Sequence, residues 1–481
     1  QQACATRDYL MLRQLFRRLT RKPKVMYFRS VRAGYDSALT TDENRRHWAA
    51  ADDLSARSAN SPQVRAILRR RARYEVANNS YARGIVLTLA NDCIGTGPRL
   101  QMLTEGPEVN RLIEKEFAKW SRVIGLAEKL RTMRMARAQD GEAFALLINN
   151  PRLPTPVKLD IRLIEADQVT TPDLSYLSNG SNTVDGIVFD EYGNPVEYHI
   201  LRCHPGDRQW PRSFEYDWVP AESVIHWFRM DRPGQVRGIP DITPALPLFA
   251  QLRRYTLAVL AAAETAADFA GILYTDAPPG GEADPAEPFE PIHLESRALV
   301  TMPGGWRMEQ LQAQQPTTTY AEFKREILNE IARCLNIPYN IAACNSSNYN
   351  YASGRLDHQT YYKNLRVEQD HLERVVLDRI LDAFMAEALL IPDLWPSGIP
   401  TYDEWPHNWF WDGHEHVDPL KEAEAQAKRL ESHTTTLAYE YARQGKDWEV
   451  ELHQRAREIE LMKELGLPVG SGSSKPIAME D

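Results

Sequence analysis

A short acid-x-lysine element, Glu322-Phe-Lys324, has the residue types of a metal-dependent nuclease, in which carboxylates hold the ion that assists cleavage. The nearest upstream Pro-Asp pairs, at 172–173 and 240–241, lie far from it along the chain. Two-residue patterns of this kind arise often by chance. A metal-dependent DNA-processing nuclease that uses Glu322 and Lys324 is therefore the alternative hypothesis rather than the leading one.

Histidines do not supply a metal site either. His414-Glu-His416 is close to a metal-binding pattern, but it lacks a third ligand at helical spacing. His199, His204 and His226 lie in or beside strand-like segments without paired spacing, so we interpret them as packed or exposed side chains. The sequence predicts no bound metal.

The motifs of phosphate and acyl chemistry are also missing from the sequence. Gly95-Thr-Gly97 is followed by neither the lysine nor the further glycine of a phosphate-binding loop. No Walker lysine motif, GxSxG, HExxH or dinucleotide-binding fingerprint occurs. We expect a protein that is not an enzyme and that needs no cofactor.

The most distinctive polar stretch is Asn345-Ser-Ser-Asn-Tyr-Asn-Tyr-Ala-Ser-Gly354, which carries no charge. Its short polar side chains compete for backbone hydrogen bonds, so it is expected to be a loop. A helix at 320–336 precedes it, with Phe323, Ile327, Ile331 and Leu335 on one apolar face. A long helix, about 355–390, follows it. The pattern fits a helical hairpin with a loose loop, or a loop that two rigid helices aim at a target.

The elements around this stretch alternate in type. Helices are expected at about 60–90, 108–120, 126–139, 243–270, 418–442 and 448–465, and strands at 99–102, 143–148, 159–164, 186–189, 196–200, 224–228 and 298–302. The second half of the helix at 243–270 is dominated by alanine, which suits helices packed side by side in an assembly. The Pro/Gly/acid-rich run at 278–291 is expected to be a loop.

Two side-chain clusters have structural interpretations. Arg69-Arg70-Arg71-Ala-Arg73 is expected to be the solvated face of a helix. The second cluster contains Trp395, Trp405, Trp409 and Trp411, and tryptophans at this density form core or interface.

Composition limits the class of protein. The 481 residues suffice for several core-forming units, and no run of eighteen apolar residues suggests a membrane span. The five cysteines are scattered, which favours a reducing compartment. The net charge is −9, yet residues 1–75 hold 17 Lys and Arg against 7 Asp and Glu, and the remainder carries −19. An acidic bulk argues against tight binding to DNA phosphates.

The order of these pieces resembles the portal proteins of tailed bacteriophages, in particular the lambda-type portal family. The pieces that carry the resemblance are Asn91-Asp-Cys-Ile-Gly-Thr-Gly-Pro-Arg-Leu-Gln101, Arg237-Gly-Ile-Pro240, Met302-Pro-Gly-Gly305, Gln312-Ala-Gln-Gln315, Tyr320-Ala-Glu-Phe323, Ile331-Ala-Arg-Cys-Leu-Asn-Ile-Pro338, Asn348-Tyr-Asn-Tyr-Ala-Ser-Gly-Arg355 and Gly445-Lys-Asp-Trp448. Their order is more specific than any one of them.

The resemblance implies an α+β portal fold with an α/β wing, a helical stem, a small clip, a tunnel loop and a helical C-terminal crown. Carried onto this chain, it gives a basic N-terminal arm at 1–45, the wing at 46–242, a stem helix at 243–271, the clip at 272–310, a second stem helix at 311–342, the tunnel loop at 343–354, a long helix and wing return at 355–417, the crown at 418–467 and a disordered tail at 468–481.

The resemblance also implies a function. Twelve copies would form a homo-oligomeric ring at one capsid vertex of the virion, assembled in the host cytoplasm, with a channel for packaging and ejection of double-stranded DNA. Further expected partners are the terminase large subunit, a head–tail connector or adaptor protein and the major capsid protein, with no membrane. A monomeric helical adaptor is a third hypothesis.

DNA must slide through such a channel, so few strong phosphate contacts are expected there. The residues expected to line the channel are Asn345, Ser346, Ser347, Asn348, Tyr349, Asn350 and Tyr351. Lys324, Arg325 and Arg333, on the preceding helix, are candidates for weak phosphate contacts or for ion pairs with acids of the next subunit.

Overall fold

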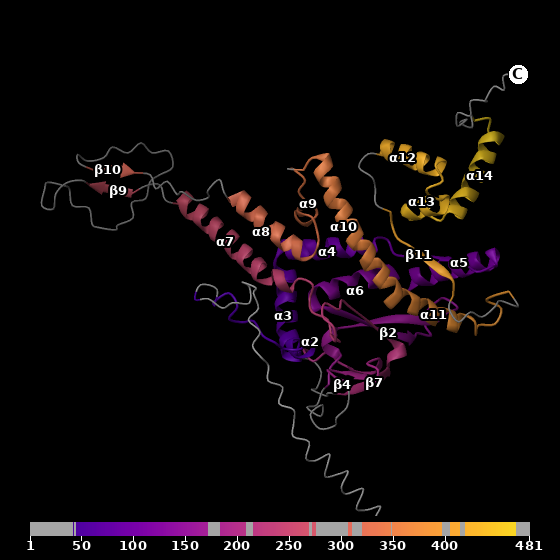
Figure 1. Cartoon of the computed structure of the whole chain (residues 1–481), viewed down its shortest axis with the longest axis horizontal. Helices are drawn as coiled ribbons and strands as arrows, with labels where there is room; N and C mark the ends of the chain where they lie inside the picture. Colours follow the sequence, from indigo (N-terminus) through magenta and orange to yellow (C-terminus); the bar gives the residue numbers. More distant parts are fainter. Residues whose placement is uncertain are drawn as a thin grey trace, which may run out of the picture. The chain divides into compact units, whose positions relative to one another are not determined.

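The computed structural model describes residues 42, 45–171, 183–207, 215–268, 272–275, 306–309, 320–347, 349–396, 405–413 and 419–467. The chain divides into two compact units, Gln1–Leu54 and Ser55–Asp481. In the first unit the described residues form little beyond turns at 45–50. The second unit contains the helices and strands below (Figure 1). In the described ranges, no helix combines the length and the apolar character needed to cross a bilayer.

The second unit begins with helices α2 (Ala56–Ala59), α3 (Pro62–Asn78), α4 (Ser80–Ile94), α5 (Pro107–Val123) and α6 (Leu126–Asp140). The single helix expected at 60–90 is therefore wrong in one respect, because Asn79 divides it. The Asn79 N–H donates to the Glu75 carbonyl at the end of α3, while its Oδ1 accepts from the N–H groups of Tyr81 and Ala82 at the start of α4. One asparagine side chain thus caps the new helix.

Two antiparallel sheets follow in the sequence. The first has the order β3-β2-β8, from Leu159–Ile164, Glu142–Asn149 and Val224–Phe228. The second has the order β4-β5-β6-β7, from Thr183–Val184, Ile187–Phe189, Pro195–Leu201 and Tyr216–Pro220. The expected strands in this region are confirmed, and β4 and β7 are additions. Strand β4 has only two residues, and β7 is a mostly exposed edge strand that lacks the apolar alternation by which strands are recognised.

The chain then forms α7 (Leu246–Asp268), which a 3₁₀ turn at Thr243–Ala245 introduces. Strands β9 (Ile272–Thr275) and β10 (Trp306–Glu309) pair antiparallel, with Trp306 opposite Thr275. Helix α8 (Tyr320–Cys334) then returns to pack against α7. The two expected helices are confirmed, whereas the expected strand at 298–302 and the loop at 278–291 lie outside the described residues.

Beyond α8, the short helix α9 (Tyr339–Ala343) leads to a long helical rod. The rod consists of α10 (Tyr351–Leu372), a π-helical turn at Glu373–Leu377 and α11 (Asp378–Ala388). It starts at Tyr351 rather than at the expected position 355, because Asn350 accepts from the Ser353 N–H and caps the first turn.

The C-terminal part contains β11 (His407–Phe410), α12 (Pro419–Glu431), α13 (Leu437–Arg443) and α14 (Trp448–Glu464). The helix expected at 418–442 is in fact two helices, since Thr436 accepts from the Tyr439 N–H and starts α13 afresh. Strand β11 pairs with β1 (Arg99–Met102), about 300 residues earlier, and places Trp409 opposite Leu100.

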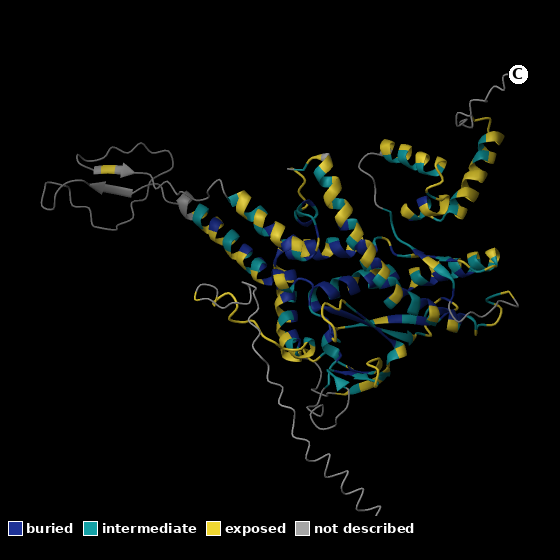
Figure 2. Ribbon diagram, viewed as in Figure 1, coloured by how far each residue is buried: buried dark blue, intermediate teal, exposed yellow. Residues whose placement is uncertain are grey.

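The main core extends through most of the second unit, and its helices α4 and α6 are largely buried (Figure 2). One part of this core lies where α5 meets α11 and β11. The Phe117 ring lies 5.3 Å from Trp120, 5.2 Å from Phe384 and 5.6 Å from Trp409, centroid to centroid. Trp405 is also buried, so the core interpretation of the tryptophan-rich stretch is confirmed for these two tryptophans. A smaller cluster, which includes Phe144, Val169, Ile187, Tyr198 and Val224, fills the space beside the second sheet.

Candidate nucleic-acid interface

The polar stretch between α8 and α10 is held at both ends by apolar packing. On α8 the buried residues are Leu328, Ile331 and Ala332, and Leu335 and Ile337 continue this face past the end of the helix. Phe323 was expected on the same face, but 51% of its surface is exposed. The loop therefore begins from a helix whose C-terminal half is fixed in the core.

The loop itself, residues 344–350, is shaped by its own side chains. Cys344 adopts a left-handed conformation (φ 49°) and ends α9. Asn345 Oδ1 accepts from the Ser347 N–H at 3.0 Å, and Asn350 Oδ1 accepts from the Ser353 N–H at 2.8 Å. Within the described part of the chain, the Nδ2 groups of Asn345 and Asn350 donate to no acceptor. These exposed amides are donors of the kind that bind phosphate oxygens.

Tyr349 is an anchor as well as a loop residue. Its hydroxyl lies near the Asp357 carboxylate of α10, and its ring lies 3.8 Å from the position a Gly354 Cβ would take. Partial burial, assisted by the charge of Asp357, raises the pKa of Tyr349. Asn348 lies outside the described residues, and Tyr351 is placed as the first residue of α10 without its side chain. Among the expected loop residues, Asn345, Ser346, Ser347 and Asn350 are exposed.

The three cations of α8 differ in how they are used. Lys324 Nζ lies 5.1 Å from the Tyr81 ring centroid and 5.7 Å from that of Tyr320, a cation–π arrangement. Arg325 pairs with the adjacent Glu326 at 3.2 Å. Arg333 is exposed and donates only to Asn336 in the described ranges. Arg333 is therefore the α8 cation with the most freedom to meet another molecule.

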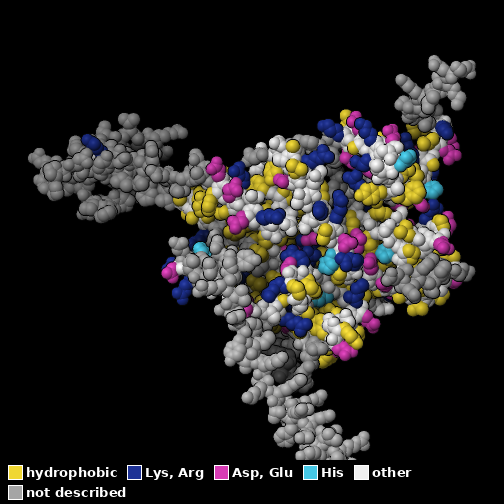
Figure 3. Space-filling view, viewed as in Figure 1, with side chains coloured by type: hydrophobic (Ala, Val, Ile, Leu, Met, Phe, Trp, Pro, Cys, Tyr) yellow, Lys and Arg dark blue, Asp and Glu magenta, His cyan; other side chains and the backbone are white. Residues whose placement is uncertain are grey.

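A further set of cations, which sequence reasoning missed, lies along α10. Arg355, Lys363 and Arg366 line an open groove of about 1050 Å³ between α10, β11 and the helices α12 and α13. Lys and Arg side chains gather over this region in the space-filling view (Figure 3). The three side chains are exposed and form no ion pair in the described part of the chain. Their spacing on the expected helix was the signal that could have revealed them.

Helix α10 is held in place by a buried charge network that also escaped sequence analysis. Arg134 on α6 donates to Glu368 at 2.9 Å and to Asp241 at 3.1 Å, and Arg137 donates to Glu368 at 3.0 Å. Both arginines are 2% exposed. Because both partner acids are bound to more than one donor, the network fixes α10 against α6 and against the chain segment before α7.

A second buried network centres on Glu142, the first residue of β2. Burial by itself would raise the pKa of Glu142. The charges of Arg237 and Arg69 and the hydrogen bond from His226 more than offset burial, so the pKa of Glu142 lies well below its usual range. The expectation that Arg69 belongs to a solvated helix face is wrong, because Arg69 is buried and pairs with Glu142 and Asp167. Arg70 and Arg71 on the same helix are exposed, as expected.

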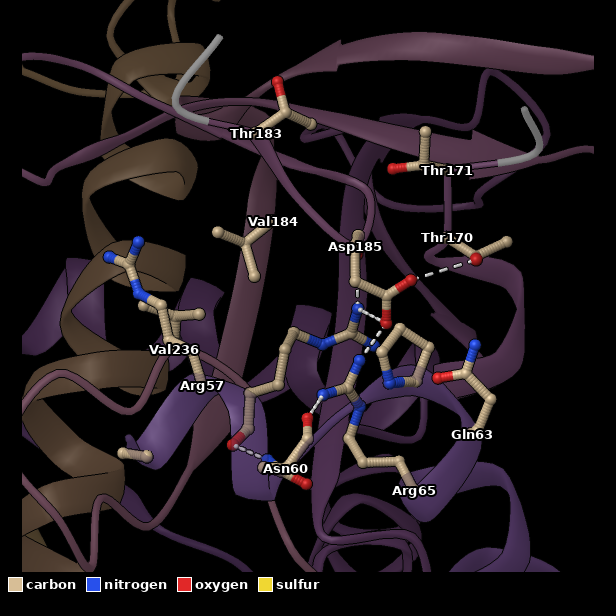
Figure 4. A pocket seen from close by; sticks show the side chains of 13 residues that line it. Arg57, Asn60, Gln63, Arg65, Thr170, Thr171, Thr183, Val184, Asp185 and Val236 are labelled. Atoms are coloured by element: carbon tan, nitrogen blue, oxygen red, sulfur yellow. Dashed lines mark hydrogen bonds and ion pairs between the residues drawn. The ribbon is translucent and has the colours of Figure 1, made fainter. Parts of the chain in front are cut away.

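A cavity of about 360 Å³ lies beside this network (Figure 4). Asp185 lies at its centre, bound by Arg65, Arg237 and the Thr170 hydroxyl. Burial, together with the charge of Arg237, lowers the pKa of Arg65 to about 10. Asp185 is fully engaged by these donors, whereas Asn60 Oδ1 and Arg65 Nε are buried without a hydrogen-bond partner among the described residues. The described lining residues form no nucleophile–base pair.

The expected histidines have three different settings. His226 bonds to Glu142, and His199 packs in contact with the ring of Trp218. His204 lies near Glu165 and Asp167, and their ligand atoms lie within 4.8 Å of one another. Sequence spacing could not reveal this group. Its space already holds a cation, however, since Arg73 pairs with both acids. His414 and His416 lie outside the described residues.

The comparisons with known proteins agree with one another. A family model described as phage portal protein, lambda family, matches residues 42–369. A curated relative, the probable portal protein of Halomonas phage phiHAP-1, is 28% identical over 435 residues, which cover 83% of this chain and 81% of that protein.

Two solved structures are also similar to this chain. The virion of a native gene transfer agent particle contains a chain with 13% identity and a TM-score of 0.48, with 85% of this chain and 94% of that chain covered. The neck of an empty particle, computed with C6 symmetry, gives 14% identity and a TM-score of 0.49, with 85% and 95% covered.

The matched region spans more than half of the sequence, and the chain belongs to the lambda family of phage portal proteins. It is a structural protein of the portal vertex of the virion, with a channel role and no enzymatic one. The family expected from the sequence is confirmed. Neither the family match nor the described residues around Glu322 and Lys324 support the nuclease alternative.

Proposed function

We propose that this portal protein forms a closed ring of twelve copies around a channel for double-stranded DNA. The observation that best supports a ring is an apolar face on α7 that is exposed in a single copy. Leu257 is 60% exposed and Leu260 is 54% exposed, although both lie on a helix that packs well against α8 elsewhere. Exposed leucines beside alanines suit close contact with a second helix, so this face packs against the next copy.

The α7–α8 pair is the stem in this proposal. The two helices are joined through Tyr255, whose ring lies 5.6 Å from Tyr320 and 5.0 Å from Phe323, and through the Tyr320 hydroxyl, which donates to Thr256. Strands β9 and β10 pair between them, so the chain leaves and re-enters the stem at one place. The segment 272–310 is thus the clip, and it docks the terminase large subunit and later the head–tail connector or adaptor protein.

The loop at 344–350 is the part of the channel wall that meets DNA. It is uncharged, and the side-chain oxygens of Asn345 and Asn350 already accept from Ser347 in the loop and Ser353 in α10. The amide donors of these two asparagines are repeated in every copy. Neutral donors hold phosphates weakly and without regard to sequence, which permits sliding. Arg333 on α8 adds a weak contact to the DNA phosphates. The C-terminal helices α12–α14 form the crown. The major capsid protein contacts the outside of the ring.

The mass of the purified chain in solution tests this proposal. The expected species is a single large oligomer of about twelve copies that binds duplex DNA weakly and independently of sequence. A stable monomer at high protein concentration would contradict the ring and would leave the monomeric adaptor as the better hypothesis. Cleavage of DNA that requires a divalent metal would instead favour the nuclease.

A further inference from the structure

Two rows of opposite charge lie on different helices of this chain. The acid row consists of Glu322, Glu326 and Glu330 on α8, and all three are exposed. Residues four apart lie on one helix face, so the three carboxylates point in nearly the same direction. Glu326 pairs only with its neighbour Arg325, and Glu322 and Glu330 form no ion pair in the described ranges.

The cation row consists of Arg355, Lys363 and Arg366 on α10, along the groove described above. Arg355 and Lys363 are eight residues apart, which is also the separation of Glu322 and Glu330. At about 1.5 Å per residue, both separations are about 12 Å. Glu322 and Glu330 thus have the same spacing and the same angular offset around their helix as Arg355 and Lys363, and Arg366 extends the cation row by three further residues.

The two rows do not meet within one chain. Helix α8 contacts α7 and α9, whereas α10 contacts α4 and the π-helical turn, and no ion pair in the described residues joins the rows. In the part of the chain that the structure describes, neither row is therefore paired with another helix or strand. Exposed charges can simply be solvated, but two exposed rows of opposite sign, in which Glu322 and Glu330 have the same spacing as Arg355 and Lys363, can pair with each other.

We propose that the acid row of one copy pairs with the cation row of the next copy in the ring. This inference rests on the proposed ring and names two of the surfaces that close it. The contact is heterologous, because the two faces differ, and such contacts give a ring when the rotation from copy to copy closes. DNA is the weaker candidate for the cation row. It would leave the acid row of α8 without a role and would be repelled by it.

Charge reversal separates these possibilities. Variant A carries Arg355→Glu and Lys363→Glu, and variant B carries Glu322→Lys and Glu330→Lys. Every contact in a ring of A alone sets acid against acid, and every contact in a ring of B alone sets cation against cation. We expect the apparent dissociation constant between copies to rise by more than about tenfold in each, less so at high salt.

Mixing variant A with variant B is the experiment that distinguishes lost charge pairing from a folding defect. In an alternating A–B ring, the wild-type acids of A meet the wild-type cations of B, and the new cations of B meet the new acids of A. Mixed samples, and a single chain with all four changes, are therefore expected to recover ring assembly. A folding defect in A or B would not be repaired in this way.

A control carries Lys115→Glu and Lys119→Glu, an equal charge change on the exposed face of α5. Wild-type-like assembly of A and B alone would overturn the pairing, and so would failure of both the mixture and the four-change chain to recover. A wild-type chain that stays monomeric would contradict the ring itself. Normal assembly of A with weakened DNA binding would assign the cation row to DNA.

Discussion

Arg237 binds both carboxylate oxygens of Glu142 in the protein interior. Its Nε lies 3.0 Å from each oxygen, and its Nη2 lies 2.7 Å from Oε1. Each residue is 1% exposed. Glu142 begins β2 and Arg237 lies shortly before α7, so this pair joins the sheet of the proposed wing to the start of the proposed stem. The Arg-Gly-Ile-Pro motif of the sequence thus has a positional role.

Replacing Arg237 with Met is expected to destabilise the fold strongly. It leaves a buried carboxylate without its main partner, and the loss of one member of such a pair costs about 3–5 kcal/mol. Arg237→Lys also loses stability, because an ammonium group cannot replace the two-point contact. Chemical denaturation measures the free energy of unfolding, with Arg71→Met on exposed α3 surface as control. Near-equal stability of Arg237→Met and the control would contradict this role.

Glu114 on α5 makes the stability of the fold near β1 and the start of α14 depend on pH. It accepts the Met102 N–H at 2.7 Å, and burial, aided by the charges of Asp447 and Glu449, raises its pKa to about 7. The folded state thus holds a proton that the unfolded state releases near a pH of about 4.5. Stability contributed by this group therefore falls as pH rises from about 4.5 to about 7.

Glu114→Gln keeps the acceptor oxygen and removes the titration. We expect the variant and the wild type to melt at similar temperatures near a pH of about 4, and the variant to melt higher near a pH of about 8. Thermal melts across this range measure the gap. A gap that is constant with pH would show that Glu114 does not titrate in this window.

The exposed leucines of α7 are expected to govern assembly rather than folding. Leu257→Glu and Leu260→Glu place charges on the proposed contact between copies, where burial without a partner is costly. The ring is expected to dissociate while the melting temperature of the monomer stays close to that of the wild type. Leu390→Glu, at a position that is 82% exposed, is the control. Intact rings in both α7 variants would exclude this face from the interface.

Ser346 is the best position at which to add charge to the loop. Asn350 is less suitable, because its replacement removes a helix cap worth about 1 kcal/mol. Ser346→Lys adds one cation per copy, so we expect slower packaging at low salt, with recovery at high salt, where the attraction to phosphates is screened. Ser346→Gln controls for size. Packaging by Ser346→Lys at the normal rate in low salt would remove the loop from the channel wall.

The sequence predicted the long helices and six strands, β1, β2, β3, β5, β6 and β8, because their apolar spacing is local. The short helices α2 and α9 and the other described strands were missed. The sequence did not predict the breaks at Asn79 and Thr436, where a single side chain caps a new helix inside a run that reads as continuous. The start of α10 at Tyr351 was missed for the same reason, since Asn350 acts as a cap rather than as a loop residue alone.

Long-range pairing explains the other differences. Arg69 was assigned to a solvated face because its partners, Glu142 and Asp167, lie more than 70 residues away. The cation row on α10 passed unnoticed because its significance depends on a groove that β11 and the C-terminal helices complete. The loop residues, in contrast, were found from composition, since uncharged polar side chains between two helices are a local feature.

Electron cryo-microscopy of the purified chain tests the central claim most directly. The expected result is a closed ring with rotational symmetry, in which residues 344–350 of every copy lie nearest the central axis and the α7–α8 pairs stand side by side around it. Single copies, or a ring with residues 344–350 on its outer rim, would contradict the account.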